Sequence, residues 1–146
     1  MQNNSENILI KKLAEDFEFD VCRVTDPQLG VATGLRLKEF IELGFHGEMK
    51  WMEQTYERRK SPINLWPEAK SAIILGLNYG PKMNPLTKND NKLLGNISVY
   101  AQGKDYHDLI KGRLKSFSSK LIARLDKKKE INVKVFVDTA PLMEKP

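Results

Sequence analysis

Apolar side chains recur every three or four positions in several stretches of the chain, and this spacing is typical of amphipathic helices. The pattern predicts helices over residues 5–18, 35–43, 48–59 and 105–125. The last range is the clearest, because lysines and arginines fill the side of the helix opposite a continuous apolar stripe. The stripe consists of Ile110, Leu114, Phe117, Leu121 and Leu125. Asp105 is placed to cap this helix, because its carboxylate can accept hydrogen bonds from the first backbone N–H groups.

Four other stretches are short and rich in apolar or β-branched residues, and they predict strands. Residues 19–27, "FDVCRVTDP", read as a strand closed by a turn. Residues 71–79, "SAIILGLNY", form a nearly unbroken apolar run, as expected of a strand covered on both faces. Residues 131–137 alternate apolar and polar side chains, which predicts a strand with one face on the core. Residues 97–101, "ISVYA", indicate a further short strand.

The order of these elements favours an α/β (α+β) fold, a mixed sheet with flanking helices. We expect one domain over residues 1–146, without a second domain. Gly44 follows the second helix and suits its C-terminal cap. Residues 80–96 are rich in Pro, Asn, Gly and Lys and predict a long polar loop.

Composition narrows the class of protein further. The chain has 146 residues, of which 40% are hydrophobic and 29% charged, as in ordinary globular proteins. No apolar run approaches the roughly 18 residues that a membrane span needs, and the N-terminus has no signal pattern. Cys22 is the single cysteine, so this chain alone forms neither an internal disulfide nor a cysteine-built metal or iron–sulfur site. We therefore expect a cytoplasmic protein without a membrane partner.

Positive charge is concentrated in one third of the chain. Residues 80–129 hold 12 lysines and arginines against 4 acidic residues, a balance of +8, whereas the whole chain carries +5. A concentrated positive field attracts polyanions such as RNA or DNA. The alternative is a solvated helix face followed by a lysine-rich loop.

Asp138 is the first candidate for chemistry. It follows the alternating segment in "VFVDTAPLMEKP". Reactive groups cluster where strands end, and a carboxylate that leaves an apolar segment can be partly desolvated. Such a carboxyl group suits a proton donor near neutral pH. The alternative is that Asp138 only caps the turn that follows it.

Two further segments carry groups that could bind a ligand. "GKDYHDLIKGRLK" places Tyr106 and His107 at a helix start, where they could donate hydrogen bonds or stack on a flat ligand. A capped amphipathic helix with a surface histidine is the alternative. "YERRKSP" offers Arg59 beside a second arginine, suited to phosphate or carboxamide oxygens. Surface ion pairs with Glu53 or Glu57 are the alternative there.

The remaining candidates are assigned to structure. His46 and Cys22 lack partners at metal-ligand spacing, and Trp51 and Trp66 are interpreted as core or lid aromatics. The sequence shows no phosphate-binding glycine loop, dinucleotide fingerprint or histidine–carboxylate cluster.

Three motifs, taken in order, closely resemble the N-terminal domain of the epoxyqueuosine reductase family over nearly the whole chain. They are "MKWME…RRKSPINLWPEAKSAIILGLNY", "ISVYAQGKDYHDLIKGRLK" and "VFVDTAPLMEK". The resemblance implies an oxidoreductase of queuosine biosynthesis, which reduces the epoxide of epoxyqueuosine at the wobble position of certain tRNAs. It also implies a cobalamin and two iron–sulfur clusters, with electrons passing through the clusters to the corrinoid.

By position, the resemblance also implies roles for individual residues. Asp138, in "VDT", would be the proton donor. Arg59, in "RRKSP", and Ser98, in "ISVYA", match places where the family contacts the corrinoid. Tyr106 and His107 fall in the "GKDYH" motif that borders the pocket.

The family continues beyond "EK" with a glycine-rich segment and two four-cysteine motifs, whereas this sequence ends at Pro146. The resemblance therefore implies a truncated or split protein, an incomplete domain that is inactive without a separate cluster-bearing chain. Two alternatives stay open: a non-catalytic tRNA- or RNA-binding module, and a decayed, truncated gene product.

Overall fold

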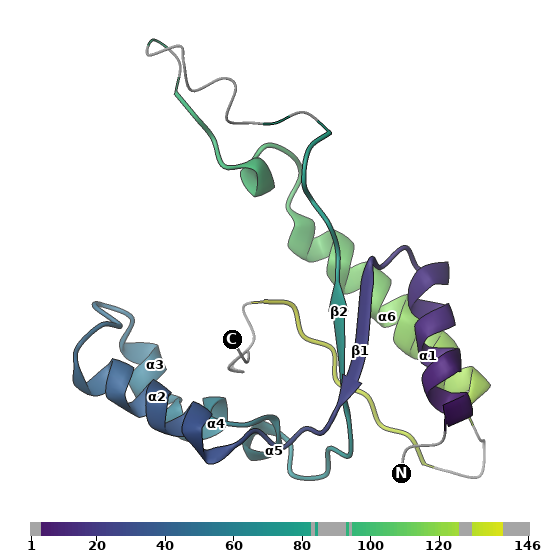
Figure 1. Ribbon diagram of the computed structural model, residues 1–146, viewed down its shortest axis with the longest axis horizontal. Coiled ribbons are helices and arrows are strands. Elements are labelled where there is room, and N and C mark those ends of the chain that lie inside the picture. The colour runs from purple at the N-terminus through teal and green to yellow at the C-terminus, as the bar shows by residue number, and fades with distance from the viewer. Residues whose placement is uncertain (1–3, 83, 85–92, 94, 126–129, 139–146) are drawn as a thin grey trace. The chain divides into compact units, whose positions relative to one another are not determined.

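The computed structural model of the chain describes residues 4–82, 84, 93, 95–125 and 130–138. It combines helices with a two-stranded antiparallel sheet, which confirms the predicted α/β class (Figure 1). In chain order the elements are α1 (Asn4–Asp16), β1 (Val21–Thr25), α2 (Val31–Glu42), α3 (Lys50–Gln54), α4 (Tyr56–Arg59), α5 (Pro62–Leu65), β2 (Ala72–Gly76), the 3-10 helix η2 (Val99–Ala101) and α6 (Tyr106–Arg124).

The internal contacts divide the chain into two compact units. The first unit consists of the N-terminal residues up to Cys22 and of Leu75–Val137. The second unit consists of Arg23–Ile74 together with the residues from Asp138 onward.

In the first unit α1 packs against α6, the two helices that the sequence pattern predicts most clearly. Their core contains Leu13, Phe19, Phe117 and Leu121, each no more than 6% exposed. The ring of Phe117 meets Phe17 and Phe19 edge to face, at centroid distances of 6.2 and 6.3 Å. Of the predicted stripe of α6, Phe117 and Leu121 are therefore buried, and Ile110, Leu114 and Leu125 are half-buried.

A charged contact fixes the end of α1. Glu18 has a left-handed backbone with φ of +57°. Its N–H bonds the carbonyl of Glu15, and the N–H of Phe19 bonds that of Ala14, both at 2.9 Å, which is the Schellman pattern. Arg113 of α6 donates to the Glu18 carbonyl at 3.1 Å and pairs with its carboxylate at 2.8 Å. One guanidinium thus joins α6 to the turn that ends α1.

In the second unit α2 packs against α4, and α4 against α5. Leu37 of α2 is 2% exposed. The helix ends at Gly44, whose φ of +71° a residue with a side chain rarely adopts. Gly44 and Phe45 donate their N–H groups to Ile41 and Phe40, and the two phenylalanine rings pack 5.7 Å apart. Gly44 therefore ends this helix as predicted.

Helix α2 begins at Val31, four residues before the predicted start, and includes Gly34. A Cβ atom at Gly34 would lie 3.3 Å from the Cβ of Lys60. The Tyr56 hydroxyl donates to the Gly34 carbonyl at 3.2 Å. The close approach of the Lys60 and Tyr56 side chains explains why a glycine stands inside the helix.

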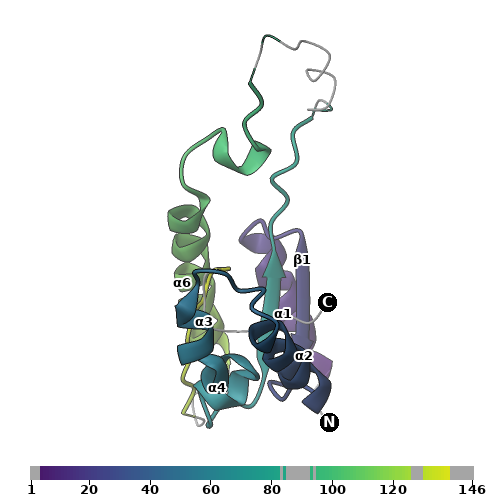
Figure 2. The same ribbon diagram turned by 90° about the vertical axis from the view of Figure 1, so that its left-hand side faces the viewer.

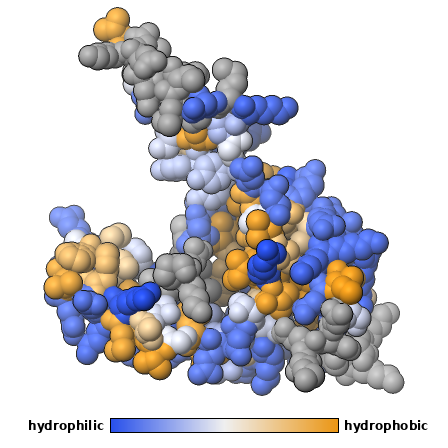
Figure 3. Space-filling view, viewed as in Figure 1, coloured by the Kyte–Doolittle hydropathy of each residue, from blue (hydrophilic) through white to orange (hydrophobic). Residues whose placement is uncertain are grey.

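The second unit also exposes large hydrophobic side chains. Orange side chains gather at the surface over α2 and α3 in Figure 3. The exposed large apolar residues of this part of the chain include Val31, Leu35, Leu43 and Phe45.

The single helix predicted over residues 48–59 is wrong in its continuity. The chain forms α3 and α4, separated at Thr55. The N–H groups of Arg58 and Arg59 both reach the Thr55 carbonyl at 3.1 Å, which tightens the backbone at the break. Helix α5 then begins with Pro62, a position where the missing proline N–H costs no hydrogen bond.

Strands β1 and β2 lie where the sequence predicts them, but Ile74 of β2 is 55% exposed, so this strand is not covered on both faces. The strand expected at 97–101 is wrong, because the segment closes into η2, the short green turn in Figure 2. Local bonds replace strand pairing there: Ala101 donates to the Ser98 carbonyl at 2.9 Å, and the Gln102 side chain donates to the Ile97 carbonyl at 2.8 Å.

The strand predicted at 131–137 is also wrong. A strand is defined by hydrogen bonds to a neighbour, and the sheet in the described part of the chain consists of β1 and β2 alone. The alternation survives only in part: Ile131, Val135 and Val137 are half-buried, whereas Val133 is 40% exposed. The long loop predicted at 80–96 lies largely outside the described residues.

Candidate functional site

The five candidate residues are distributed over both compact units. Ser98 lies before η2, and Tyr106 and His107 form the start of α6, all within the first unit. Arg59 ends α4, and Asp138 lies in a turn, both in the second unit. The structure brings Tyr106 and His107 into direct contact, and each other candidate is described in its own surroundings.

Asp105 organises the start of α6, as its predicted role as a cap requires. Its carboxylate accepts a hydrogen bond from the backbone N–H of His107 at 2.9 Å. The same oxygen lies 2.8 Å from Nδ1 of the His107 ring. The backbone hydrogen bond, followed by that of the ring, lowers the pKa of Asp105 below its ordinary value. One carboxylate therefore caps the helix and orients the imidazole.

The rings of Tyr106 and His107 stack on each other. Their centroids are 4.3 Å apart and their planes differ by 23°. Both side chains are half-buried. The first turn of α6 thus presents a paired aromatic surface with one phenol and one imidazole, groups that can stack on a ring or exchange hydrogen bonds.

Arg59 is held by contacts along α3 and α4. Its guanidinium carbon lies 4.3 Å from the centroid of the Trp51 ring. Its Nε donates to the Thr55 hydroxyl at 2.8 Å. Burial lowers the pKa of Arg59, and the neighbouring charge of Arg58 adds to this. Glu57, one of its suggested ion-pair partners, pairs with Lys60 at 2.6 Å.

Asp138 and Ser98 are both exposed. Asp138 lies in a turn, but its predicted place at the end of a strand is wrong because the described residues just before it form no strand, and the partial desolvation expected of it is not found because the residue is exposed. Ser98 adopts an extended backbone, and its carbonyl accepts the first bond of η2.

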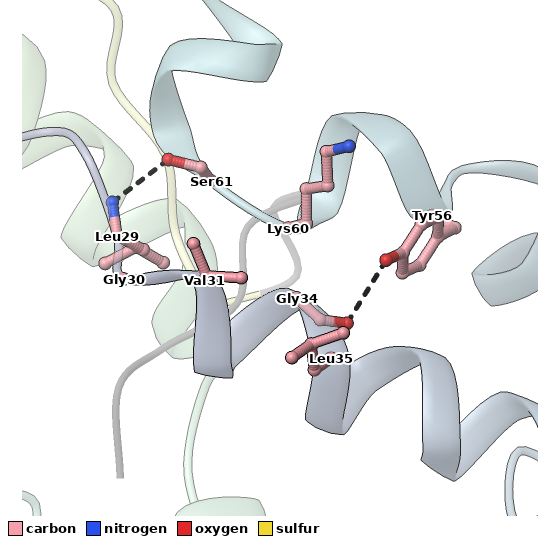
Figure 4. A pocket seen from close by; sticks show the side chains of 8 residues that line it. All are labelled: Leu29, Gly30, Val31, Gly34, Leu35, Tyr56, Lys60 and Ser61. Atoms are coloured by element: carbon pink, nitrogen blue, oxygen red, sulfur yellow. Dashed lines mark hydrogen bonds between the residues drawn. The ribbon is translucent and has the colours of Figure 1, made fainter.

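A hollow of about 190 Å³ lies within the second unit, beside the start of α2 (Figure 4). Ser61, which is 6% exposed, forms part of its wall. The Ser61 hydroxyl accepts from the N–H of Leu29 at 3.1 Å and donates to the Pro27 carbonyl at 3.3 Å. None of the five candidate residues lines this hollow. The sequence analysis missed Ser61; its place before Pro62 was the available signal of a helix start.

Helix α6 carries cations that the structure leaves uncompensated. Arg113 is paired with Glu18. The other cations of the helix, as far as the chain is described, lie within 4.0 Å of no carboxylate. They are Lys111, Lys115, Lys120 and Arg124, all exposed. Such exposed cations suit a polyanion better than a neutral partner.

Among the described residues no three His, Cys, Asp or Glu side chains gather as a metal site. Cys22 is buried at 9% exposure. No helix in the segments that the structure describes has the length and apolarity needed to cross a bilayer.

Comparison with known proteins gives a consistent result. The family described as "Epoxyqueuosine reductase QueG, DUF1730" matches residues 59–139, a range that contains all five candidate residues. A protein of Cyclobacterium marinum named epoxyqueuosine reductase is 34% identical over 137 residues, which are 94% of this chain. Proteins of the same name from Leadbetterella byssophila and Escherichia coli are 36% and 31% identical, over 93% and 94% of the chain.

The chain spans 42% of the length of the first two relatives and 35% of the third. No solved structure matches the chain. The family match covers more than half of the sequence and the relatives match nearly all of it, so this chain belongs to the epoxyqueuosine reductase QueG family.

Proposed function

We propose that this chain is the N-terminal part of an epoxyqueuosine reductase, which faces the corrinoid and the modified nucleoside of tRNA. The observation that carries the proposal is the family match over residues 59–139, which includes each of the five candidate residues. Reduction of epoxyqueuosine to queuosine is then the activity of the assembled enzyme, and this chain contributes to it rather than performing it alone.

The side chains present suit a cobalamin by their chemistry. A corrinoid carries amide groups and one phosphate at its periphery, and Arg59, Ser98, Tyr106 and His107 are hydrogen-bond donors or acceptors of the matching kind. The fixed orientation of the Arg59 guanidinium and the stacked pair on α6 support this assignment. When bound, the cobalamin supplies the reducing metal centre that acts on the substrate carbon.

Each candidate residue of the chain has its own role in this proposal. Arg59 and Ser98 would bind the corrinoid periphery, and Tyr106 and His107 would offer it their stacked rings and hydrogen-bonding groups. Asp138 would give a proton to the epoxide oxygen as its carbon–oxygen bond breaks; reduction of the epoxide to the ring double bond of queuosine takes two electrons and a second proton, and releases that oxygen as water. The exposed position of Asp138 in a turn makes it accessible to such a substrate.

The chain does not suit the iron–sulfur clusters of the family. A cluster needs about four cysteine thiolates, and this chain offers Cys22 alone. We therefore propose that the clusters are bound by residues outside this sequence, and no step above passes through them.

The test is substitution of Asp138 by asparagine in the chain combined with a cluster-bearing polypeptide, cobalamin, a reductant and epoxyqueuosine-containing tRNA. We expect queuosine formation to fall by about a hundredfold or more, the size typical of losing a general acid. Asp108→Asn, which removes an exposed carboxylate of α6, is the matched control. Unchanged queuosine formation by the Asp138 variant would refute the role of this residue.

A second candidate function is RNA binding without catalysis. The uncompensated cations of α6 and the +8 balance of residues 80–129 favour it. Such a module binds tRNA with an affinity that falls steeply with salt, survives Asp138→Asn and weakens when Lys111 and Lys115 are changed to glutamine. Binding that is absent, or insensitive to salt, would exclude it.

A further inference from the structure

Arg59 does not stand alone, because two neighbours along the chain contact its guanidinium. We propose that Trp51 and Thr55 are positioning residues that fix the Arg59 guanidinium to receive a phosphate group. The three residues are called the arginine cluster below. The inference rests on the proposed function only for the source of that phosphate, which is either the corrinoid or RNA.

The contacts of the arginine cluster determine the orientation of the guanidinium. The Trp51 ring, 4.3 Å from the guanidinium carbon, restrains its position from one side. The bond from Nε to the Thr55 hydroxyl, 2.8 Å long, restrains rotation about the side chain's last bonds. The Thr55 hydroxyl itself donates to the Trp51 carbonyl, so its proton is directed away from Arg59 and its oxygen accepts. Trp51 and Thr55, which both contact the Arg59 guanidinium, are thus also bonded to each other.

Arg59 is bonded to Thr55, the residue at the break between α3 and α4. Thr55 interrupts the helix, and its carbonyl receives the backbone N–H of Arg59 at 3.1 Å while its hydroxyl receives the side chain. Trp51 remains 46% exposed although it is the largest side chain in α3. An aromatic ring that only stabilised the core would be expected to lie deeper. Its position beside an arginine points to a role at the surface.

Preorganisation gives this arrangement a measurable effect. A free arginine side chain has about 2 kcal/mol of rotamer entropy to lose when a ligand fixes it. Contacts that hold the guanidinium before binding reduce that loss and strengthen binding without touching the ligand. Partial burial, which lowers the pKa of Arg59, also weakens the competition of water for the guanidinium.

The first experiment tests by NMR whether Trp51 and Thr55 hold the Arg59 guanidinium in place. In the full chain the Nε–H proton of Arg59, observed by NMR, should exchange slowly and be shifted by the ring current of Trp51. Thr55→Val, which keeps the shape and removes the acceptor, should abolish the slow exchange. Trp51→Leu should remove the shift, whereas Trp51→Phe should retain part of it. Fast exchange in the unsubstituted chain would overturn the proposal whatever the ligand.

The second experiment measures binding, with hydroxocobalamin followed by visible absorption and unmodified tRNA by fluorescence anisotropy. Thr55→Val and Trp51→Leu should each weaken binding of the phosphate source by about threefold to tenfold, as one hydrogen bond or one cation–π contact is worth. Each should have little further effect in an Arg59→Lys background, because they act through Arg59. Circular dichroism and Trp66→Phe control for folding and for loss of a tryptophan.

Cobinamide, which lacks the phosphate of the nucleotide loop, separates the two sources. If the corrinoid supplies the phosphate, the substitutions weaken hydroxocobalamin binding and leave cobinamide and tRNA unaffected. If RNA supplies it, only tRNA binding weakens. Equal losses in the presence and absence of Arg59 would overturn the positioning role. Failure of the unsubstituted chain to bind cobalamin, with the slow Nε–H intact, would refute the cofactor assignment and not the positioning.

Discussion

Substitution of Phe117 tests whether α6 is held by the aromatic core of the first unit. The ring is 3% exposed and makes two edge-to-face contacts, with Phe17 and Phe19. Each aromatic pair of this kind contributes about 0.5–1.5 kcal/mol beyond its buried area. Phe117→Leu keeps an apolar side chain and removes both pairs, so we expect a loss of about 1–3 kcal/mol. Phe117→Ala adds a cavity and should cost about 3–5 kcal/mol.

Urea unfolding followed by circular dichroism measures this loss. For a chain of this size, with a slope of about 1–3 kcal/mol per molar urea, the Phe117→Leu midpoint should fall by roughly 1 M. Leu109→Ala is the control, because this side chain of the same helix is 51% exposed and its loss should change stability by less than about 0.5 kcal/mol. Combining Phe117→Leu with Phe19→Leu should give a loss smaller than the sum of the two.

A result in which Phe117→Leu and Leu109→Ala have the same small effect would refute this reasoning, because the core would then not depend on the Phe117 ring. Strict additivity with Phe19→Leu would refute the aromatic contact in particular, since independent sites add and touching ones do not.

Three further changes have expected outcomes. The hydrogen bond from the backbone N–H of His107 lowers the pKa of the Asp105 carboxyl group. The contribution of this cap to the stability of α6 is therefore complete above the ordinary carboxyl pKa of 3.8, and it is lost as the pH falls through the lowered pKa. Asp105→Asn keeps a good cap, so its helicity between about pH 5 and pH 2 should vary less than that of the unsubstituted chain by circular dichroism. Gly44→Ala forces a side chain into a left-handed backbone and should cost about 1–2 kcal/mol in thermal unfolding, whereas Gly112→Ala, inside α6 with open space around it, should gain about 0.5–1 kcal/mol. If both changes destabilise equally, the backbone argument fails. Ser61→Ala removes the acceptor of the half-buried Leu29 N–H and the donor to the Pro27 carbonyl, and should cost about 1–3 kcal/mol in urea unfolding; a loss below about 0.5 kcal/mol would contradict the role of this hydroxyl.

The elements that the sequence predicted correctly are those whose pattern is local and long. The stripe of α6 and its cap at Asp105 are both encoded within about twenty residues, and the structure has both. The strand expected at 131–137 failed for the opposite reason. Its alternation is real, but a strand exists only where another strand pairs with it, and periodicity carries no information about the partner.

The candidate residues also show which features a local pattern predicts and which it does not. Tyr106 and His107 lie at the start of α6, so their place follows from the helix that the sequence predicted; their stacking does not, because adjacent residues of a helix do not face each other. The surroundings of Arg59 were predictable only in part. Trp51, Thr55 and Arg59 stand four residues apart, so the helix predicted over 48–59 already places them on one face. The contacts among them were missed because Trp51 was interpreted as a core or lid aromatic, whereas it is 46% exposed and its ring lies beside Arg59.

This difference determines how the start of α6 and the arginine cluster should each respond to substitution. The start of α6 is capped by Asp105 and the helix is anchored a few turns later by Phe117, so a substitution in the cap should disturb His107 without unfolding the first unit. The arginine cluster has no buried side chain in α3 or α4 beneath it. The contacts among its own three residues contribute to its order, and so does the packing of α4 against α2 and α5. Thr55→Val should therefore loosen Arg59 while changing the free energy of unfolding, measured in urea, by less than about 0.5 kcal/mol. If Thr55→Val instead lowers stability as much as Phe117→Leu, then Thr55 serves the fold of the second unit first, and its bond to Arg59 is a consequence of that role.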